Sequence, residues 1–304
     1  MASRTRLAKF LSTTFVEPLG TQVSEDGFRG YYIDLRVKAK RSGWPDAWPY
    51  APGAQSYVAL AQLGLGAYER FVAGEGEEWL ALARGVGDML CDNQIETGGF
   101  AHSFDLPHTY PLSAPWISAM SQGQGASLLV RLHLETGDER YAAVARSALG
   151  PLRVPVGEGG AMAPLDGRPF PQEFPTDPPA FVLNGGIFAM WGLHDVGRGL
   201  GDGDALREFG ESVDTLAANL HRWDTGSWSL YDLYPHPIRN WASLAYHQLH
   251  INQLHAMAAL DPRPELGVIA GRFERYLASR ARRMRAFAHK AAFRIAVPRR
   301  RQAR

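Results

Sequence analysis

The chain contains very little cysteine and no long hydrophobic run. Its 304 residues include one cysteine, Cys91, which excludes an intramolecular disulfide and a metal site built on cysteines. We interpret Cys91 as a buried core thiol. No apolar run approaches the roughly 20 residues that cross a bilayer, and the N-terminal stretch lacks the apolar core of a signal peptide. We therefore expect a cytoplasmic protein.

The C-terminal segment contains no acidic residue at all. Residues 280–304 include ten Arg or Lys and no Asp or Glu, whereas the rest of the chain has 22 basic and 31 acidic residues. Residues 281–304 are therefore predicted to form a basic tail on an acidic body. Two interpretations stay open, a solvated appendage or a contact with a polyanion or an anionic lipid surface. The second would place the protein peripherally at the inner membrane face. The acidic body argues against nucleic acid as a partner.

What the sequence does have is a repeated plan of two helices. Three segments open on an aromatic residue, Trp116, Phe181 and Tyr246, which are spaced 65 positions apart in the sequence. In each, an apolar helix leads through a Gly, Asp or Pro break into an amphipathic helix. A related unit begins near residue 56. The first helix of each unit is apolar nearly all round, which predicts an inner position, and the second predicts an outer one.

These units predict an all-α fold, an α/α toroid (barrel) of about four helical hairpins over residues 51–280. Each unit needs its neighbours to cover its inner helix. An open solenoid is the alternative, but it would need polar end repeats, and the first and last inner helices are as apolar as the others. Gly-rich segments after three units predict short β-hairpins in the connecting loops. Residues 1–50 are predicted to form an extended, strand-like segment and a loop.

Polar side chains interrupt the apolar inner helices, and each needs a partner because an unpaired buried polar group is costly. They either bind a ligand or satisfy one another and the backbone. The candidates for substrate binding are Gln122, Gln124, Asn184, His247 and Asn252. Trp116 is a candidate for stacking on a sugar ring. His247 and His250 share a helix face that lacks an acidic third ligand, so we expect no metal site.

Four motifs resemble one known family. The stretches "PWISAMSQGQG", "EFPTDPPAFVLNG", "WDTGSWSLYDL" and "YHQLHINQL" resemble the C-terminal catalytic domain of the D-glucuronyl C5-epimerases in order and in spacing. The resemblance runs from about residue 50 to residue 280. Members of that family convert glucuronate to iduronate within heparan-type, heparosan-like chains. The resemblance therefore implies an α/α barrel, an isomerase without an organic cofactor and a uronate-containing glycan as its partner.

The resemblance also implies that Glu173, Tyr231 and Tyr246 are catalytic. Epimerisation removes the C5 proton, which is α to a carboxylate, and returns a proton to the opposite face. The reaction therefore needs two acid–base groups on opposite sides of the sugar. Glu173 stands in a Pro-rich, apolar stretch, where desolvation would raise its pKa and make it a stronger base. We expect Glu173 to act on one face and Tyr246 on the other, with Tyr231 assisting.

The sequence departs from the family pattern beside two of its motifs. The family's Arg and His after "YDL" are Tyr234 and Pro235 here, so we expect Arg239 to neutralise the substrate carboxylate instead. The family's "EEYPT" is "QEFPT" here, so Gln172 lacks the charge and Phe174 the hydroxyl. Two alternatives to an epimerase stay open. One is a uronate polysaccharide lyase that abstracts the same proton, and the other is a non-catalytic glycan-binding protein.

Overall fold

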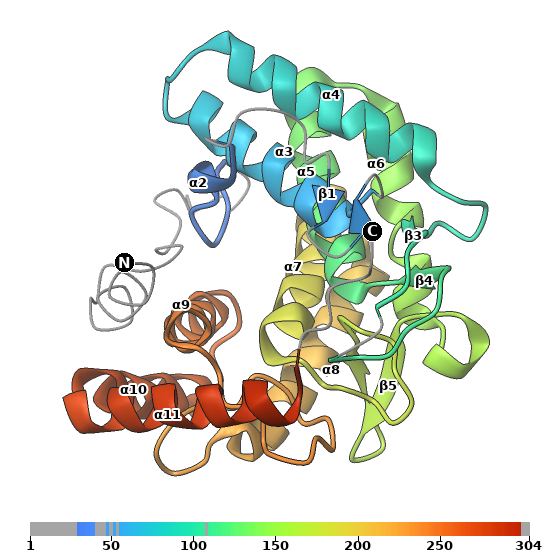
Figure 1. Cartoon of the computed structure of the whole chain (residues 1–304). Helices are drawn as coiled ribbons and strands as arrows, with labels where there is room; N and C mark the ends of the chain where they lie inside the picture. The colour runs from blue at the N-terminus through green and yellow to red at the C-terminus, as the bar shows by residue number, and fades with distance from the viewer. Residues whose placement is uncertain (1–28, 40–46, 49–50, 53–54, 107–108, 299–304) are drawn as a thin grey trace.

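Four helical hairpins form the body of the protein (Figure 1). The structure is a computed structural model that describes residues 29–39, 47–48, 51–52, 55–106 and 109–298. The hairpins are α3 (Tyr57–Val72) with α4 (Glu77–Asn93), α5 (Ala119–Thr136) with α6 (Glu139–Ser147), α7 (Leu183–Gly199) with α8 (Gly203–Asn219), and α9 (Leu244–Leu260) with α10 (Pro264–Ala278). They coincide with the four predicted units, which confirms the predicted all-α fold class of about four helical hairpins with inner and outer helices.

The inner helices follow one another around the core in chain order. Helix α5 packs on both α3 and α7, and α7 packs on α9, while α4, α6, α8 and α10 each cover the helix that precedes them. Nearly every residue of α5 and α7 is buried, as the apolar composition of these helices predicts. Among the described residues α3 and α9 share at most a marginal contact, so direct packing of the first inner helix on the last does not close the ring.

Local signals in the sequence set where the helices begin. Ser56, Asp138, Asp202 and Ser243 are N-caps whose side chains accept a hydrogen bond from a main-chain amide of the first turn. Helix α5 is capped at its C-terminus by Gly137, which has a φ of 72° and therefore adopts the left-handed conformation that glycine tolerates best. The hairpin turns thus match the Gly and Asp breaks of the sequence.

Two short antiparallel strand pairs lie in the connecting loops, as predicted: β3 (Ala101–His102) with β4 (Trp116–Ile117), and β5 (Met162–Leu165) with β6 (Arg168–Pro171). A further pair, β1 (Ala47–Trp48) with β2 (Ala51–Pro52), precedes the first hairpin. The third Gly-rich segment, residues 223–233, has isolated bridges instead of a strand pair. Single turns of 3-10 helix cover Gly150–Arg153, Val156–Glu158 and Leu220–Trp223. The hairpin of β5 and β6 leads directly into the loop that carries Glu173, so it fixes where that loop begins.

The predicted N-terminal segment is only partly described. Residues 1–28, 40–46 and 49–50 lie outside the described residues. The strand-like interpretation is wrong at Arg36–Ala39, which form the short helix α2 packed on α3. The sequence signal was the alternating stretch "FRGYYIDLRVKAK", but Tyr31 and Tyr32 are neighbours in the chain and are both buried instead of alternating between core and solvent.

The basic C-terminal segment forms a packed helix, α11 (Arg280–Ala296). It contacts α9 and α10, and Figure 1 shows it alongside α10 at the end of the molecule opposite α4. Ala286 and Phe293 of this helix are buried. The interpretation of this segment as a solvated appendage is therefore wrong for Arg280–Ala296, while residues 299–304 lie outside the described residues. None of the described helices is long and apolar enough to cross a membrane.

Two contacts hold α5 against α7. In their C-terminal halves, Arg131 and Asp195 form a fully buried ion pair at 2.6 Å, and the hydroxyl of Tyr32 also bonds to the Asp195 carboxylate. Near the start of α5 and the middle of α7, the helices touch through glycine: a Cβ added to Gly192 would lie 2.4 Å from the Cα of Gly123. The two backbones approach this closely only because neither position carries a side chain.

We predict that Gly192→Ala destabilises the protein by about 1–3 kcal/mol, because the added methyl meets main-chain atoms that cannot move aside. The matched control is Gly210→Ala in the outer helix α8, where an added Cβ meets nothing within 4 Å. That control should be neutral or stabilising by up to about 1 kcal/mol. Urea unfolding of the two variants and the wild type provides the measurement. Equal stabilities for the two variants would contradict the packing described.

Candidate active site

Glu173 lies over the first turn of α7. A Cβ added to Gly185 would lie 2.2 Å from Oε2 of Glu173, so the carboxyl group occupies the space that the missing side chain leaves. Glu173 is 8% exposed, and its Oε2 has no hydrogen-bond partner among the described residues. Burial, together with the negative charge of Asp232, raises the pKa of Glu173 to about 8. Such a carboxyl group exchanges protons near neutral pH.

Gln172 fixes the loop that carries Glu173. Its side-chain oxygen accepts a hydrogen bond from the Phe181 amide (3.0 Å) and its side-chain nitrogen donates to the Phe170 carbonyl (3.0 Å). Its own carbonyl accepts from the amide of Ala119 at the start of α5 (2.9 Å). A buried amide thus ties both ends of the loop together, which a carboxylate could not do because it has no donor. The change from the family's Glu to Gln172 is therefore compatible with an ordered loop.

Tyr231 and Tyr246 meet beside this loop. Their rings are 4.7 Å apart and nearly perpendicular. Tyr246 stands on the first turn of α9 and is 39% exposed, while the Tyr231 carbonyl accepts from the amide of Leu183 at the start of α7 (3.1 Å). Burial, followed by the nearby charge of Glu173, raises the pKa of Tyr231 well above its usual value. The structure therefore brings all three predicted catalytic residues together, with Tyr231 as a protonated phenol.

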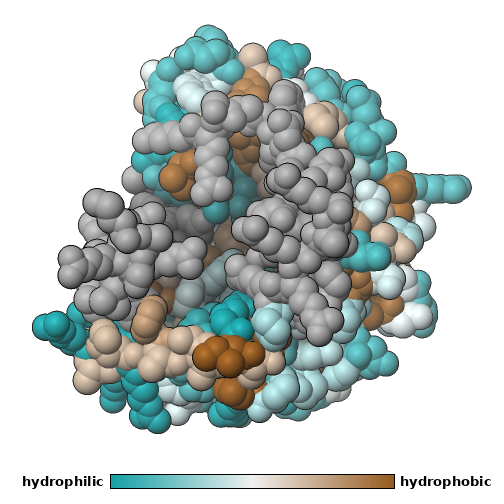
Figure 2. Space-filling model, in the orientation of Figure 1, coloured by the Kyte–Doolittle hydropathy of each residue, from teal (hydrophilic) through white to brown (hydrophobic). Residues whose placement is uncertain are grey.

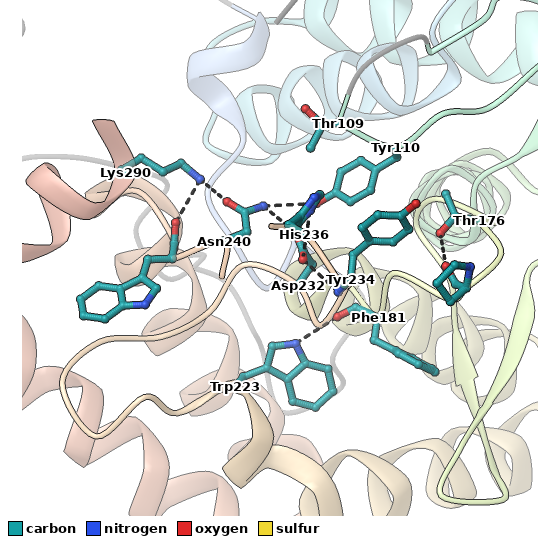
Figure 3. A network of polar contacts seen from close by, with 12 residues as sticks. Thr109, Tyr110, Thr176, Phe181, Trp223, Asp232, Tyr234, His236, Asn240 and Lys290 are labelled. Atoms are coloured by element: carbon teal, nitrogen blue, oxygen red, sulfur yellow. Dashed lines mark hydrogen bonds and ion pairs between the residues drawn. The ribbon is translucent and has the colours of Figure 1, made fainter. Parts of the chain in front are cut away.

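The residue after Tyr231 is a buried carboxylate, Asp232, at the centre of a network of polar contacts (Figure 3). It accepts hydrogen bonds from the hydroxyl of Tyr110 and the side-chain amide of Asn240. Nε2 of His236 lies 3.4 Å from its other oxygen. The ring of Phe174, which follows Glu173 directly, stacks on Tyr110 at 4.4 Å. Phe174 therefore packs on the network where the family's tyrosine would have placed a hydroxyl.

Lys290 joins this network from α11. Its ammonium donates to Oδ1 of Asn240 (2.6 Å) and to the Trp241 carbonyl (3.0 Å), and Figure 3 shows it at the end of the chain of contacts that leads to Asp232. It lies 5.7 Å from the ring centre of Tyr231. Lys290 was missed by the sequence analysis. The available signal was its identity, because it is the single Lys among the ten basic residues of 280–304.

Three residues predicted to bind substrate have buried side chains that contact other parts of the protein instead. The side chain of Gln122 fits between the Phe100 amide (2.9 Å) and the Ala148 carbonyl (3.1 Å), in the orientation that satisfies both of its polar atoms. The ring nitrogens of His247 contact the Ser229 hydroxyl (2.8 Å) and the Phe273 carbonyl (3.0 Å). Gln122 and His247 are fully buried, so the structure contradicts both predictions.

Trp116 is the third of these residues. It is 8% exposed, its indole donates to the Phe104 carbonyl (2.8 Å), and its ring stacks on His102 at 4.2 Å. The ring faces are therefore taken up by protein, and the prediction of sugar stacking by Trp116 is wrong. The sequence could not have distinguished the two cases, because an aromatic residue in a core and one in a glycan site look the same in sequence.

The other predicted binding residues remain candidates. Gln124 is buried, and neither polar atom of its side chain has a partner among the described residues, nor does Oδ1 of Asn184 beside Gly185. Arg239 is exposed on the loop that follows Asp232. The half-buried Asn252 accepts from Gln248 (3.1 Å). Unsatisfied buried amides of this kind are uncommon in proteins and are often completed by water or ligand.

The histidines of α9 are not arranged as metal ligands. His247 and His250 share the hydroxyl of Ser229 through their Nδ1 atoms, and burial lowers the pKa of His247 to about 3. Farther along the helix, His255 pairs with Glu274 at 2.8 Å. Within the described part of the chain, no group of three or more His, Cys, Asp or Glu residues is placed to hold a metal ion.

The site thus combines a carboxyl group that titrates near neutral pH with a phenol that keeps its proton. The carboxylate can accept a proton from a weakly acidic carbon, and the phenol can donate one to a carbanion. One further group carries positive charge near the pair, Lys290 from α11, and Arg239 is exposed on the adjoining loop. The arrangement fits proton transfer at a carbon next to a carboxylate.

Comparison with known proteins gives relatives of this chain. A sequence model of the family described as D-glucuronyl C5-epimerase C-terminus matches residues 93–275. The D-glucuronyl C5-epimerase of Caenorhabditis elegans is 30% identical over 207 residues, covering 62% of this chain and 34% of that protein. An uncharacterized protein of Methanocaldococcus jannaschii is 34% identical over 140 residues, covering 44% of this chain and 45% of that protein. The chain thus spans less than half the length of either relative.

A solved structure is similar in its helical arrangement. It is the unsaturated glucuronyl hydrolase of Bacillus sp. GL1, an enzyme responsible for the degradation of glycosaminoglycan. The two chains are 18% identical, with a TM-score of 0.47, and the match covers 83% of this chain and 64% of the hydrolase.

We predict that Glu173→Gln changes how stability depends on pH. The folded protein holds the Glu173 proton up to about pH 8, while the unfolded chain releases it near its usual value of about 4.3. Wild-type stability therefore falls relative to the Gln variant as pH rises between these values. Urea unfolding of both proteins at pH 5 and pH 9 gives the measurement. The stability of Glu173→Gln minus that of wild type should be larger at pH 9 than at pH 5 by on the order of 3 kcal/mol.

The exposed Glu158 provides the matched control for this measurement. Glu158→Gln should differ from wild type by the same small amount at both pH values, because its carboxyl group is in water in either state. A Glu173→Gln variant whose stability difference from wild type stays constant with pH would show that the carboxyl group is not held in a desolvated place.

Proposed function

Because the chain belongs to the family of the D-glucuronyl C5-epimerase C-terminal domain, we propose that it is a C5-epimerase of a uronic acid within an oligo- or polysaccharide. The proposed reaction is of the glucuronate-to-iduronate type and uses no organic cofactor. The observation that carries the proposal is Glu173, a buried carboxyl group with a pKa raised to about 8, beside the paired phenols of Tyr231 and Tyr246.

In the proposed reaction, the Glu173 carboxylate takes the C5 proton, and the electron pair of the C–H bond passes into the neighbouring substrate carboxylate. Tyr246, which is partly exposed at the start of α9, then donates its proton to C5 from the opposite face. Tyr231 stabilises the resulting phenolate of Tyr246 as a hydrogen-bonding neighbour. Protons lost and gained balance within one turnover, and solvent restores the two residues to their starting states.

The developing negative charge on the substrate carboxylate needs positive charge close by. We assign this role to Arg239, as expected from the sequence, together with Lys290, which lies 5.7 Å from the Tyr231 ring centre. The unsatisfied side-chain amide of Gln124 and Oδ1 of Asn184 are suited to sugar hydroxyl groups, which both donate and accept hydrogen bonds. Asn252 is a further candidate for the same role.

We predict that the protein introduces deuterium at C5 when it is incubated in deuterated water with glucuronate-containing chains, starting with heparosan. Glu173→Gln and Tyr246→Phe should each lower the exchange rate by a factor on the order of 100 or more, because each removes one proton-transfer group. The wild-type rate should rise with pH up to about 8, since Glu173 accepts a proton only when ionised. Mass spectrometry and NMR of the recovered uronate give the measurement.

The control for this experiment is Glu158→Gln, which should exchange at the wild-type rate. An absorbing unsaturated uronate instead of C5 label would mean that the 4-substituent leaves and that the protein is a lyase. A protein that binds these chains but gives neither label nor unsaturated product, with or without the Glu173→Gln change, would be a glycan-binding protein and would overturn the proposal.

A second prediction concerns Lys290, whose ammonium holds Asn240 and Trp241 at the end of the loop that begins at Tyr231. Lys290→Met should lower the C5 exchange rate about tenfold, because the loop loses its anchor and small displacements of catalytic groups are costly. The matched control on the same helix is the exposed Arg280, and Arg280→Met should exchange on soluble chains at the wild-type rate. A C5 exchange rate of Lys290→Met equal to that of wild type would show that Lys290 does not anchor this loop for catalysis.

A further inference from the structure

Helix α11 turns an apolar face toward solvent. Met284, Ala288, Ala291 and Ile295 follow one another at intervals of four, three and four residues, which places them on one side of the helix. All four are exposed, Met284 by 40% and Ile295 by 82%. We call these four residues the outer face of α11. Figure 2 shows apolar surface along this helix in the lower part of the view.

The orientation of this face is fixed by the other side of the helix. Ala286 and Phe293 are buried against the body of the protein, and Phe293 packs edge-on against His236 at 5.1 Å. Lys290 is anchored to Asn240. The inner side of α11 therefore already makes the contacts that hold the helix in place, and the outer face takes no part in them.

Positive charge flanks the outer face. Arg280 is exposed next to Met284 on one flank, and Arg285 is exposed on the other. The segment 280–304 as a whole has ten basic and no acidic residues. On the neighbouring helix α10, the exposed Val268 has Glu265 three residues before it and Arg272 four residues after it, so the charge around it is mixed. The combination of an apolar face and basic flanks is a property of α11 and not of the adjacent outer helix.

We propose that α11 docks flat on an anionic lipid surface, with its outer face in the headgroup region and its arginines among the lipid phosphates. Helices that lie in a membrane interface have this construction, an apolar side flanked by Lys and Arg. Each basic residue near an anionic bilayer contributes about 1 kcal/mol of attraction, and the apolar side chains add the free energy of leaving water. The proposal is independent of the chemistry at Glu173.

Two other occupants fit the face less well. A polyanionic glycan would bind the arginines but would leave Met284 and Ile295 in water, so it accounts for the charge and not for the apolar residues. A second copy of the chain would cover the apolar residues, but a two-fold interface sets the same patch against itself. The basic segment of one copy would then oppose the basic segment of the other, which contains no acidic residue for it to pair with.

The test is flotation of the full-length protein with vesicles. Vesicles of equimolar phosphatidylglycerol and phosphatidylcholine should bind it, vesicles of phosphatidylcholine alone should bind it far more weakly, and added salt should release it. The double variant Met284→Ser/Ile295→Ser should lower the partition coefficient about tenfold. Val268→Ser on α10, at 58% exposed the matched apolar control, should leave the partition coefficient unchanged.

Each other outcome overturns the proposal. Equal binding of the wild type to both vesicle types, or wild-type partitioning of the double variant, would show that the outer face does not contact lipid. Retention on heparin without binding to anionic vesicles would identify a glycan as the occupant. A dimer in sedimentation that the double variant converts to a monomer would identify a second copy. Thermal unfolding checks that the double variant is folded, and Ile295→Ser, the most exposed position, replaces it if it is not.

Discussion

The close approach of α5 and α7 determines the geometry of the candidate site. The two helices touch backbone to backbone at Gly123 and Gly192, so the positions of their N-terminal turns are fixed relative to each other. Those turns hold the site, because the amide of Ala119 at the start of α5 binds the Gln172 carbonyl and the amide of Leu183 at the start of α7 binds the Tyr231 carbonyl. A side chain at either glycine would separate the helices and, with them, the two halves of the site.

Within that frame, Glu173 is held in a place that opposes its ionisation. Its carboxyl group fills the space over Gly185 without a hydrogen-bond partner for Oε2, and the charge of Asp232 adds to the effect of burial. A core residue would not normally be left in this state, because an ionised buried carboxylate is unfavourable. Proteins accept such a local cost chiefly where a site uses it. The same desolvation that is expected to weaken the fold at alkaline pH would make this carboxylate a stronger base than an exposed one.

The sequence predicted the hairpins well because helix periodicity and Gly or Asp breaks are local signals, and the helix starts at Asp138 and Asp202 follow from them directly. The family resemblance also led to the candidate trio of Glu173, Tyr231 and Tyr246, because the motif that carries each residue is contiguous, and the structure brings the three side chains together. The sequence analysis failed for His247, since the sequence shows that a polar side chain interrupts an apolar helix but not that Ser229 and the Phe273 carbonyl satisfy it. Lys290 was out of reach for the same reason: its partner Asn240 lies 50 residues away.

Helix α11 connects the two proposals through its opposite sides. Its inner side holds Asn240, and through Asn240 the carboxylate of Asp232 and the main chain of Tyr231. Its outer face is the one proposed to meet lipid. An α-helix with its side chains is about 10 Å in diameter. If the outer face lies on the bilayer, the loop from Tyr231 to Asn240, which is held by the inner side, would stay about one helix diameter from the membrane surface. If both proposals hold, a glycan attached to a lipid would reach Glu173 with less freedom to lose than a chain in solution, so the reaction would be expected to favour its membrane-proximal uronates.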